Sequence, residues 1–424
     1  MRTGLGKTRN GLTAALDVGS SKVCCFIAAT EESGRPRVLG IGQQASRGVR
    51  NGNVVDMEGC EGAIRNAVHA AEQMAGDTIE QVVVNLSGGH PASNSIGIEV
   101  SIAGHEVGES DLRRALQHGR QVNGTSDTNG QSRRLIHSIP VGYSIDDSRG
   151  IRDPRGMYGE RLGVRMHLVT AGASAIRNLT TCIGRCHLSV AGFVVSPYAA
   201  GLATLVEDEM DLGVTLVDMG GGTTTIALFF GGNVIYTDVV PVGGIHVTND
   251  IARGLSTPLA HAERLKTLYG HAMAAAAAER EMIDVPRVGE DQQENESQQV
   301  PRSILFGIIQ PRLEETFELV RSRLETSDLA QVVGRRVVLT GGASQLPGLR
   351  DLAALILDKQ VRVGRPNRAL GLAEATSGPA FATCAGLLTF AVESNLAASR
   401  QPTPKLKHPS SFMGRLGDWV REHF

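Results

Sequence analysis

The sequence has little of several features that define large protein classes. Aromatic residues make up only 4% of the 424 residues, and Trp419 is the single tryptophan. No apolar run approaches the roughly 18 to 20 residues that a membrane-spanning helix needs. The net charge of −2 argues against nucleic acid as the main partner. The six cysteines include no C-x-x-C pair, so they predict buried thiols in a reducing cytoplasm and no metal site.

Two segments about two hundred residues apart share one pattern. In each, an apolar strand ends in Asp and runs into a glycine-bearing turn: Ala14-Ala-Leu-Asp-Val-Gly-Ser-Ser-Lys22 and Val214-Thr-Leu-Val-Asp-Met-Gly-Gly-Gly-Thr-Thr224. Glycines let backbone N–H groups close on anionic oxygens, so both turns are predicted to hold phosphates. Carboxylate oxygens suit the Mg²⁺ that accompanies a nucleotide, which makes Asp17 and Asp218 the predicted magnesium ligands.

The rest of the chain predicts alternating strands and helices. Residues 13–29 and 37–45 have the pattern of strands, 59–74 of a helix, and 336–348 of a third strand followed by a glycine turn. Residues 90–166, with short strands and a helix from about 110, predict an inserted subdomain. The segment 284–303 is rich in Gln, Glu, Pro and Ser, and we expect a solvated loop there. Helical patterning returns at 304–325.

The last fifteen residues predict an amphipathic helix behind a proline-rich tether. At 100° per residue, its apolar side chains fall within an arc of about 140°; they are Phe412, Met413, Leu416, Trp419, Val420 and Phe424. A helix of this kind can lie in a membrane interface. The alternative is a terminal helix that packs on the protein's own body. A single helix of this length would bind weakly, so membrane attachment should be coupled to self-association.

Each glycine motif alone is modest evidence, but their order is more specific. An Asp-Val-Gly-Ser-Ser turn, an Asp-x-Gly-Gly-Gly-Thr turn and an apolar Thr340-Gly-Gly-Ala-Ser344 turn resemble the phosphate-1, phosphate-2 and adenosine motifs of the actin, Hsp70 and sugar-kinase superfamily. The resemblance implies an α/β fold of two ribonuclease-H-like lobes with ATP and Mg²⁺ between them. Within that superfamily, Leu86-Ser-Gly-Gly-His90, Leu135-Ile-His-Ser-Ile-Pro140 and Trp419-Val-Arg-Glu-His-Phe424 resemble the FtsA family of bacterial cell division.

The resemblance implies roles for individual residues. In the first lobe, Asp17, Gly19, Ser20, Ser21 and Lys22 would bind the phosphates and the magnesium shell. From the facing lobe, Asp218, Gly220, Gly221, Gly222 and Thr223 would do the same. Glu263 and Lys266 match positions that hold ribose and adenine in relatives, although by spacing alone they predict a helix-surface ion pair. The base pocket would be floored by Gly243, Gly244, Gly341, Gly342, Ala343 and Ser344.

The resemblance also predicts a division into eight parts: first lobe 1–84, inserted subdomain 85–165, first lobe again 166–198, second lobe 199–245, its small subdomain 246–330, the adenosine motif and the return to the first lobe 331–395, a linker 396–409 and the membrane-targeting helix 410–424. One departure concerns chemistry. Hydrolysing relatives carry Glu-Pro-x-Ala-Ala, whereas this chain has Ser196-Pro-Tyr-Ala-Ala200. A serine cannot replace that glutamate as a base, so we expect weak or absent ATPase activity and leave open whether the protein is an enzyme.

The family's biology implies the partners. The chain would form actin-like filaments on the cytoplasmic face of the inner membrane at the division site, as a peripheral protein that anchors the FtsZ ring. The FtsZ C-terminal tail would bind near Arg312, which aligns with a helix start in the family, and later division proteins would bind the inserted subdomain. Two alternatives stay open: an ATP-binding assembly scaffold resembling PilM and a small-molecule kinase. A chaperone of the Hsp70 type is disfavoured, because no peptide-binding domain follows residue 396.

Overall fold

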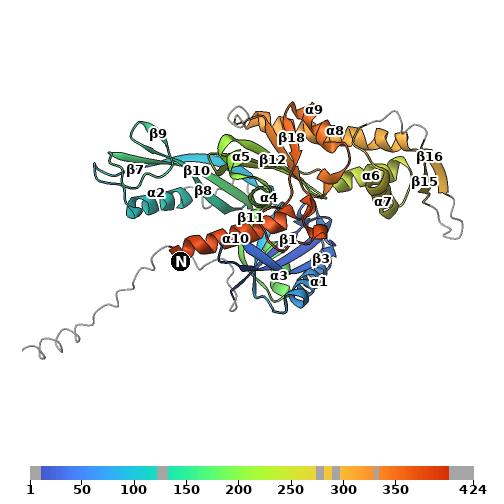
Figure 1. Ribbon diagram of the computed structural model, residues 1–424, viewed down its shortest axis with the longest axis horizontal. Coiled ribbons are helices and arrows are strands. Elements are labelled where there is room, and N and C mark those ends of the chain that lie inside the picture. The colour runs from blue at the N-terminus through green and yellow to red at the C-terminus, as the bar shows by residue number, and fades with distance from the viewer. Residues whose placement is uncertain are drawn as a thin grey trace, which may run out of the picture.

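In the computed structural model, residues 11–121, 132–273, 281–288, 297–327, 329 and 334–400 are described. They form two lobes, each built on a five-stranded sheet, and an inserted subdomain that projects to one side (Figure 1). The prediction of an actin-like α/β fold is confirmed. None of the described helices is long and apolar enough to span a bilayer.

The first lobe begins with three antiparallel strands, β1 (Leu12–Val18), β2 (Lys22–Thr30) and β3 (Pro36–Ala45). The order β11-β6-β1-β2-β3 is completed by the parallel strands β6 (Gln81–Leu86) and β11 (Ser189–Val195). Helices α1 (Met57–Ala75) and α3 (Ala173–Arg185) cover one face, and the short pair β4 (Val49–Arg50) and β5 (Asn53–Val54) precedes α1. Asp56 caps α1 by accepting hydrogen bonds from the amides of Glu58 and Gly59.

The second lobe repeats this plan. Strands β12 (Val214–Met219), β13 (Thr224–Phe230) and β14 (Asn233–Val240) are antiparallel, and β17 (Arg336–Thr340) and β18 (Gln360–Val363) lie parallel to β12 in the order β14-β13-β12-β17-β18. Helices α5 (Glu207–Leu212) and α9 (Leu349–Leu357) and the turn η2 (Gly342–Gln345) complete it. The predicted strand–turn–strand pattern around Asp218 is therefore confirmed.

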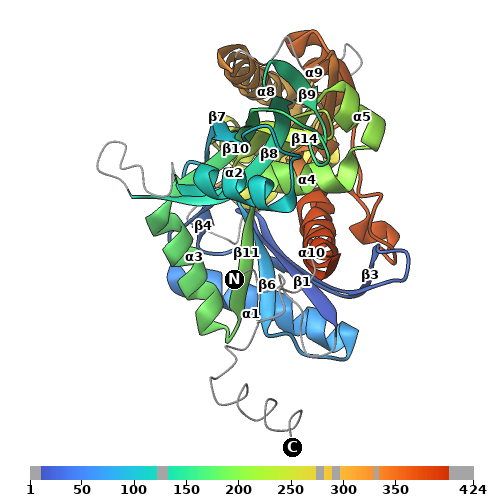
Figure 2. The same ribbon diagram turned by 90° about the vertical axis from the view of Figure 1, so that its left-hand side faces the viewer.

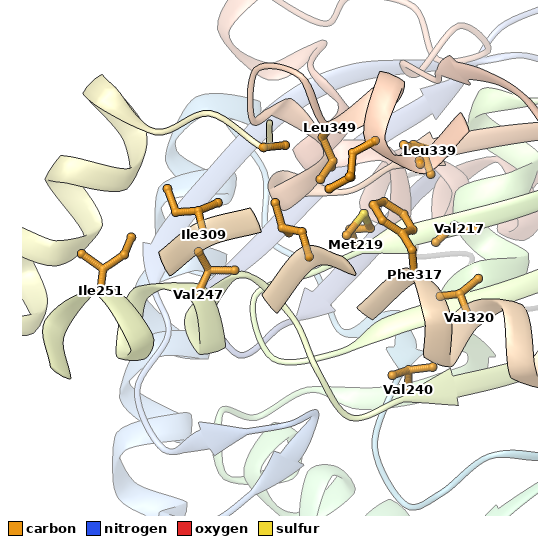
Figure 3. Packing of buried hydrophobic residues seen from close by; sticks show 14 of the residues in the cluster. Val217, Met219, Val240, Val247, Ile251, Ile309, Phe317, Val320, Leu339 and Leu349 are labelled. Carbon is orange, nitrogen blue, oxygen red and sulfur yellow. The ribbon is translucent and has the colours of Figure 1, made fainter. Parts of the chain in front are cut away.

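Between β14 and β17 lie α6 (Gly244–Gly254), α7 (Leu259–Tyr269), β15 (Met282–Pro286), β16 (Ser297–Pro301) and α8 (Arg302–Thr326). Phe317 of α8 lies beside Met219 and Val217 of β12, Val320 lies toward Val240 of β14, and Ile309 lies toward Val247 of α6 (Figure 3). The expectation of a loop over 284–303 is partly wrong, because β15 and β16 pair as an antiparallel ribbon. Buried Ile283, Val285 and Val300 anchor that ribbon to the core, whereas the other face keeps the polar residues that suggested a loop.

The inserted subdomain contains β7 (Ala92–Ser101), α2 (Glu109–Gln121), β8 (Arg133–Ile145), β9 (Ser148–Ile151) and β10 (Arg161–Gly172). Its antiparallel sheet has the order β7-β10-β8-β9. Alternate residues of β10 (Leu162, Val164, Met166, Leu168) join residues of α2 in a separate core. The subdomain therefore has its own hydrophobic interior.

Two helices join the lobes: α4 (Ser196–Thr204) follows β11, and α10 (Ala382–Arg400) follows the short turns η3 (Glu374–Thr376) and η4 (Pro379–Phe381). Both views place α4 and α10 between the two sheets (Figures 1 and 2). They cross at Gly386, where a Cβ would overlap the carbonyl oxygen of Ala199. Only glycine at residue 386 permits this separation of the helices.

Candidate nucleotide-binding cleft

The two predicted phosphate turns line one cavity of about 480 Å³ between the lobes. This volume lies within the usual range for a small-molecule site. Most of the predicted binding residues line it: Asp17, Gly19, Ser20, Ser21, Lys22, Asp218, Gly220, Gly221, Gly222, Thr223, Gly244, Glu263, Lys266, Gly341, Gly342 and Ala343. The fold therefore brings together segments up to about three hundred residues apart.

The same backbone hydrogen bond closes both turns. The Gly19 amide donates to Lys22 O at 3.0 Å, and the Gly220 amide donates to Thr223 O at 2.8 Å. In each case the turn joins two antiparallel strands, β1 to β2 and β12 to β13. The first turn is therefore structurally equivalent to the second, with Asp17 matching Asp218 one residue before the end of its strand.

The turns touch one another through unlike residues. A Cβ on Gly222 would lie 2.5 Å from Ser20 Oγ and 2.8 Å from Ser20 Cβ, and a Cβ on Gly221 would lie 2.7 Å from Ser21 Cβ. Ser20 Oγ also accepts the Gly52 amide at 3.0 Å. The second turn consists of glycines because the serines of the first turn occupy the space that its side chains would need.

Asp17 and Asp218 are buried carboxyls of the cleft. Burial raises the pKa of Asp17 to about 6, against a smaller opposing effect of Lys22. Burial and the nearby Asp17 together raise the pKa of Asp218 to about 7. Burial and the repulsion between the two carboxylates therefore both disfavour the state in which Asp17 and Asp218 are negatively charged together. A divalent cation would remove that penalty, so the pair fits a magnesium ion.

Asp17 and Asp218 supply two carboxylates, so a cation held there would complete its shell with water and phosphate oxygens, as Mg²⁺ commonly does. Thr225 Oγ1 also lines the cavity, buried and without a hydrogen-bond partner, which leaves a polar atom for a ligand or water to satisfy.

At the other end of the cavity, Lys266 connects α7 to α6. Its Nζ lies 2.7 Å from Glu263 Oε2 and donates to Gly244 O at 3.1 Å and Thr248 Oγ1 at 2.9 Å. The ion pair expected from the spacing exists, and both members also line the cleft. The two interpretations of this pair are compatible.

Two residues expected to floor the base pocket do not line it. Gly243 lies behind the second phosphate turn, where a Cβ would come within 2.6 Å of Gly220 O. Ser344 is buried on the far side of η2, and its hydroxyl donates to Gly341 O at 2.7 Å. Their roles are structural: Gly243 allows α6 to approach the turn, and Ser344 closes η2.

Two residues of the cleft, Asn85 and Thr383, order the site and were not predicted from the sequence. Asn85 Oδ1 accepts the Val18 amide at 2.7 Å, and Asn85 Nδ2 donates to Ser196 Oγ at 3.2 Å. Thr383 Oγ1 donates to Asp218 Oδ2 at 3.0 Å. Asn85 could have been noticed as one amide inside the apolar strand Val82–Leu86, whereas Thr383 shows no signal in the sequence.

The proposed partner-binding residue lies outside this cleft. Arg312 is inside α8, next to Pro311, and not at a helix start as predicted. Its guanidinium makes two bonds to the Asp250 carboxylate and another contact with Glu315. The apolar residues proposed for membrane contact, Phe412 to Phe424, lie outside the described part of the chain.

Comparison with known proteins identifies the family. The model for the cell division protein FtsA matches residues 215–386, and that for the SHS2 domain inserted in FtsA matches residues 88–170. The chain is 45% identical to the FtsA of Agrobacterium fabrum, with 99% of this chain and 96% of that protein covered. It is 32% identical to the FtsA of Escherichia coli, with 98% and 99% covered. The chain belongs to the FtsA family.

Solved structures show the fold shared by this FtsA-family chain. A PilM–PilN type IV pilus biogenesis complex matches with a TM-score of 0.62 at 19% identity, covering 90% of this chain and 98% of the other. MreB5 of Spiroplasma citri bound to ADP matches at 0.56 and 13%, covering 93% and 100%. A MamK double helical filament matches at 0.50 and 12%, covering 90% and 98%. The chain is thus an actin-like cell division protein.

Proposed function

We propose that the cleft binds ATP with Mg²⁺. The observation that carries this proposal is the meeting of two equivalent turns, which bring Asp17 and Asp218 to one cavity that the glycines and serines of both turns also line. Bound magnesium would neutralise charge on the phosphates, and the two carboxylates would hold its water shell. Ser20, Ser21, Gly221 and Gly222 would donate N–H groups to phosphate oxygens, because the Gly19 and Gly220 amides already close the turns. The ADP-bound MreB5 gives the proposal support at the level of the fold.

Titration calorimetry with ATP, with and without Mg²⁺, tests this directly. The parent should bind Mg·ATP, and Asp17→Ala and Asp218→Ala should each bind it more weakly. The exposed Asp147→Ala, in the inserted subdomain, is the matched control for removal of a carboxylate. Equal affinity in all four proteins would contradict the magnesium assignment, and no binding by the parent would contradict nucleotide binding.

Hydrolysis should be slow. At the position where hydrolysing relatives have glutamate, the Ser196 hydroxyl accepts a hydrogen bond from Asn85 and offers no base. The cleft would thus act as an ATP-dependent assembly switch. A steady-state rate above about 1 s⁻¹, the low end for ordinary enzymes, would contradict this if Asp218→Ala abolished the activity.

The cellular role that we propose is assembly into filaments on the cytoplasmic face of the inner membrane, where the protein anchors the FtsZ ring and recruits later division proteins through the inserted subdomain. Membership in the FtsA family and the filament formed by the fold relative MamK support it. Trp419 provides a test, because its fluorescence reports only on the C-terminal segment. Liposomes should shift its emission to the blue, and Mg·ATP should strengthen the shift through avidity. Emission already blue in buffer and indifferent to lipid would exclude the membrane anchor.

FtsZ binding can be tested at Arg312. We expect Arg312→Glu to weaken binding of an FtsZ C-terminal peptide, more at low salt than at high salt, because charge reversal acts through a screened interaction. The intramolecular pair with Asp250 provides the control. Asp250→Asn removes one of the two carboxylate charges paired with the guanidinium, the other being Glu315, and should leave peptide binding intact or strengthen it. Unchanged binding by Arg312→Glu at low salt would place the site elsewhere.

A further inference from the structure

Thr383 holds the second-lobe carboxylate from a different segment of the chain. It is the second residue of α10, and its hydroxyl donates to Asp218 Oδ2 at 3.0 Å. Both side chains are buried and line the cleft. A buried threonine hydroxyl of this kind has few alternative partners, so the bond restricts the rotation of both side chains.

The other oxygen of Asp218 is restricted by packing. A Cβ on Gly341 would lie only 2.4 Å from Oδ1, so the carboxylate occupies space that a side chain at residue 341 would need. Gly341 has a φ of +85°, which also favours glycine. The adenosine motif and α10 therefore fix the carboxylate of the phosphate-2 motif from two sides.

We propose that Thr383 is a positioning residue for Asp218 in Mg·ATP binding, an inference that rests on the function proposed above. Its hydroxyl holds Oδ2, so the carboxylate meets the magnesium shell without first losing rotational freedom. Groups that orient metal-binding side chains are typically worth 10- to 100-fold in metal affinity. The hydroxyl, and not the shape of the side chain, carries the effect.

Two variants separate these contributions. Thr383→Val keeps the shape and removes the donor, and Thr383→Ser keeps the donor. In calorimetry with Mg²⁺, ATP affinity should fall at least tenfold in Thr383→Val and remain within about threefold of the parent in Thr383→Ser. In EDTA, Thr383→Val and the parent should bind ATP equally, because a hydroxyl that acts through magnesium has no effect without it.

An equal loss in Mg²⁺ and in EDTA would show a structural role and overturn the proposal. Parent-like binding of Thr383→Val in Mg²⁺, with Asp218→Ala impaired, would overturn it and leave nucleotide binding standing. If the parent binds no nucleotide, both fail.

At the junction of the inserted subdomain with the two lobes, two histidines each form a hydrogen bond with one backbone group of an edge strand. Strands β11 and β14 are edge strands, and edge strands leave N–H and C=O groups unpaired. His137 of β8 accepts the Val195 amide of β11 at Nε2, 3.1 Å away. His167 of β10 meets Val234 O of β14 at Nδ1, 3.0 Å away.

The hydrogen bonds define the state of His167. A carbonyl only accepts, so Nδ1 carries the proton and Nε2 accepts from Ser93 Oγ at 2.6 Å. Ser93 Oγ in turn accepts the Thr237 amide of β14 at 3.3 Å. The chain of bonds begins and ends on one edge strand and is complete only for a neutral imidazole.

We infer that the inserted subdomain bridges the two lobes and reports the opening of the cleft through these histidines. Val195 immediately precedes Ser196, which lines the cleft, and β14 pairs with β13, which begins just after the second phosphate turn. A change in the angle between the lobes must therefore disturb the contact of His137 or that of His167. Nucleotide occupancy would then reach the surface of the inserted subdomain.

Hydrogen exchange resolved at the Val195 and Thr237 amides tests this bridge. Mg·ATP should slow exchange at both amides together with Gly220 to Thr223. In His167→Leu, Thr237 should exchange faster and the effect of nucleotide at Val195 should shrink. His167→Asn, whose amide can still donate to Val234 O, should be intermediate, and the exposed His69→Gln should match the parent.

Protection of the cleft amides by Mg·ATP with no change at Val195 and Thr237 would overturn the bridge while leaving nucleotide binding intact. A normal nucleotide effect at Val195 in His167→Leu would likewise overturn it. If no cleft amide responds to Mg·ATP, the bridge and the proposed function both fail.

Discussion

The two phosphate turns have the same backbone and different side chains. Both follow an Asp, both close with a glycine amide bonded to a carbonyl three residues on, and both join antiparallel strands at the centre of a sheet. The first turn carries Ser20, Ser21 and Lys22 where the second carries Gly221, Gly222 and Thr223. The lobes face each other, so side chains can occupy the narrow space between the turns from one lobe only. The asymmetry is a packing requirement of two similar lobes whose turns meet at one cleft.

The largest effect on ligand binding is expected when a side chain is added to the second turn. Gly222→Ser makes the second turn more like the first, and its Cβ would collide with Ser20. Overpacking of this kind costs about 3 kcal/mol at its upper range, so Mg·ATP affinity should fall roughly 150-fold by calorimetry. Adding Ser20→Gly should restore part of the loss. If Gly222→Ser alone binds like the parent, the turns do not meet as described.

Removal of charge from one turn at a time should have the next largest effect. Asp17→Asn and Asp218→Asn keep the shape of each side chain, and each should lower Mg·ATP affinity about 10- to 100-fold. In EDTA the same substitutions should strengthen ATP binding or leave it unchanged, because they remove negative charge beside the phosphates. A loss of affinity in EDTA as large as that in Mg²⁺ would contradict a role in metal binding.

Acid should change the free energy of unfolding in opposite directions through two pairs of residues. These are the cleft carboxyls Asp17 and Asp218 and the histidines of the subdomain junction, His137 and His167. Burial lowers the pKa of His137 to about 3 and that of His167 to about 4, from 6.5. Between pH 6.5 and 4 the histidines of the unfolded chain therefore bind protons before those of the folded chain. As the pH falls through this range, each histidine lowers the free energy of unfolding by about 1.4 kcal/mol per pH unit. Asp17 and Asp218 have raised pKa values, so the folded chain binds their protons first and stability rises as pH falls through about 7 to 4.

Urea unfolding at several pH values separates the two effects. The parent should show a shallow pH dependence, because the contributions oppose each other. His137→Gln should lose stability at pH 7 and gain relative to the parent as the pH falls to 4.5. A constant difference between this variant and the parent across that range would mean that His137 is not buried in its neutral form.

The smallest expected effect belongs to Lys22, whose counterpart in the second turn is Thr223. The Lys22 Nζ lies 3.3 Å from the centroid of the Phe381 ring. Its positive charge lowers the pKa of Asp17, although by less than burial raises it. Lys22→Met should weaken ATP binding by about 1 kcal/mol, or roughly fivefold, and the difference should shrink at high salt. Thr223→Val should change affinity less. A larger loss of ATP affinity in Thr223→Val than in Lys22→Met would contradict the expectation that the side chain of the first turn contributes more to binding.

The sequence predicts the local features of this site well and the long-range features poorly. Strand, Asp and glycine turn are encoded within ten residues, so Asp17 and Asp218 could be found by reading the chain. The Thr383–Asp218 bond joins residues 165 positions apart and depends on the path of α10. Arg312 has the pattern of a free docking residue, whereas Asp250, 62 positions away, pairs with it. Ribbon β15–β16 was not predicted because β16 contributes a single buried residue, Val300, behind the polar run Ser297-Gln-Gln299.

The contact between α4 and α10 at Gly386 sets how the two lobes can turn. The point where two crossed helices touch can act as a pivot. When the lobes rotate about it, an atom at the crossing moves little, and the displacement of any other atom grows with its distance from the crossing. A methyl group at residue 386 would overlap Ala199 O unless the two helices moved apart, and such a movement would change the angle between the lobes. The width of the cleft therefore depends on a residue that does not line it.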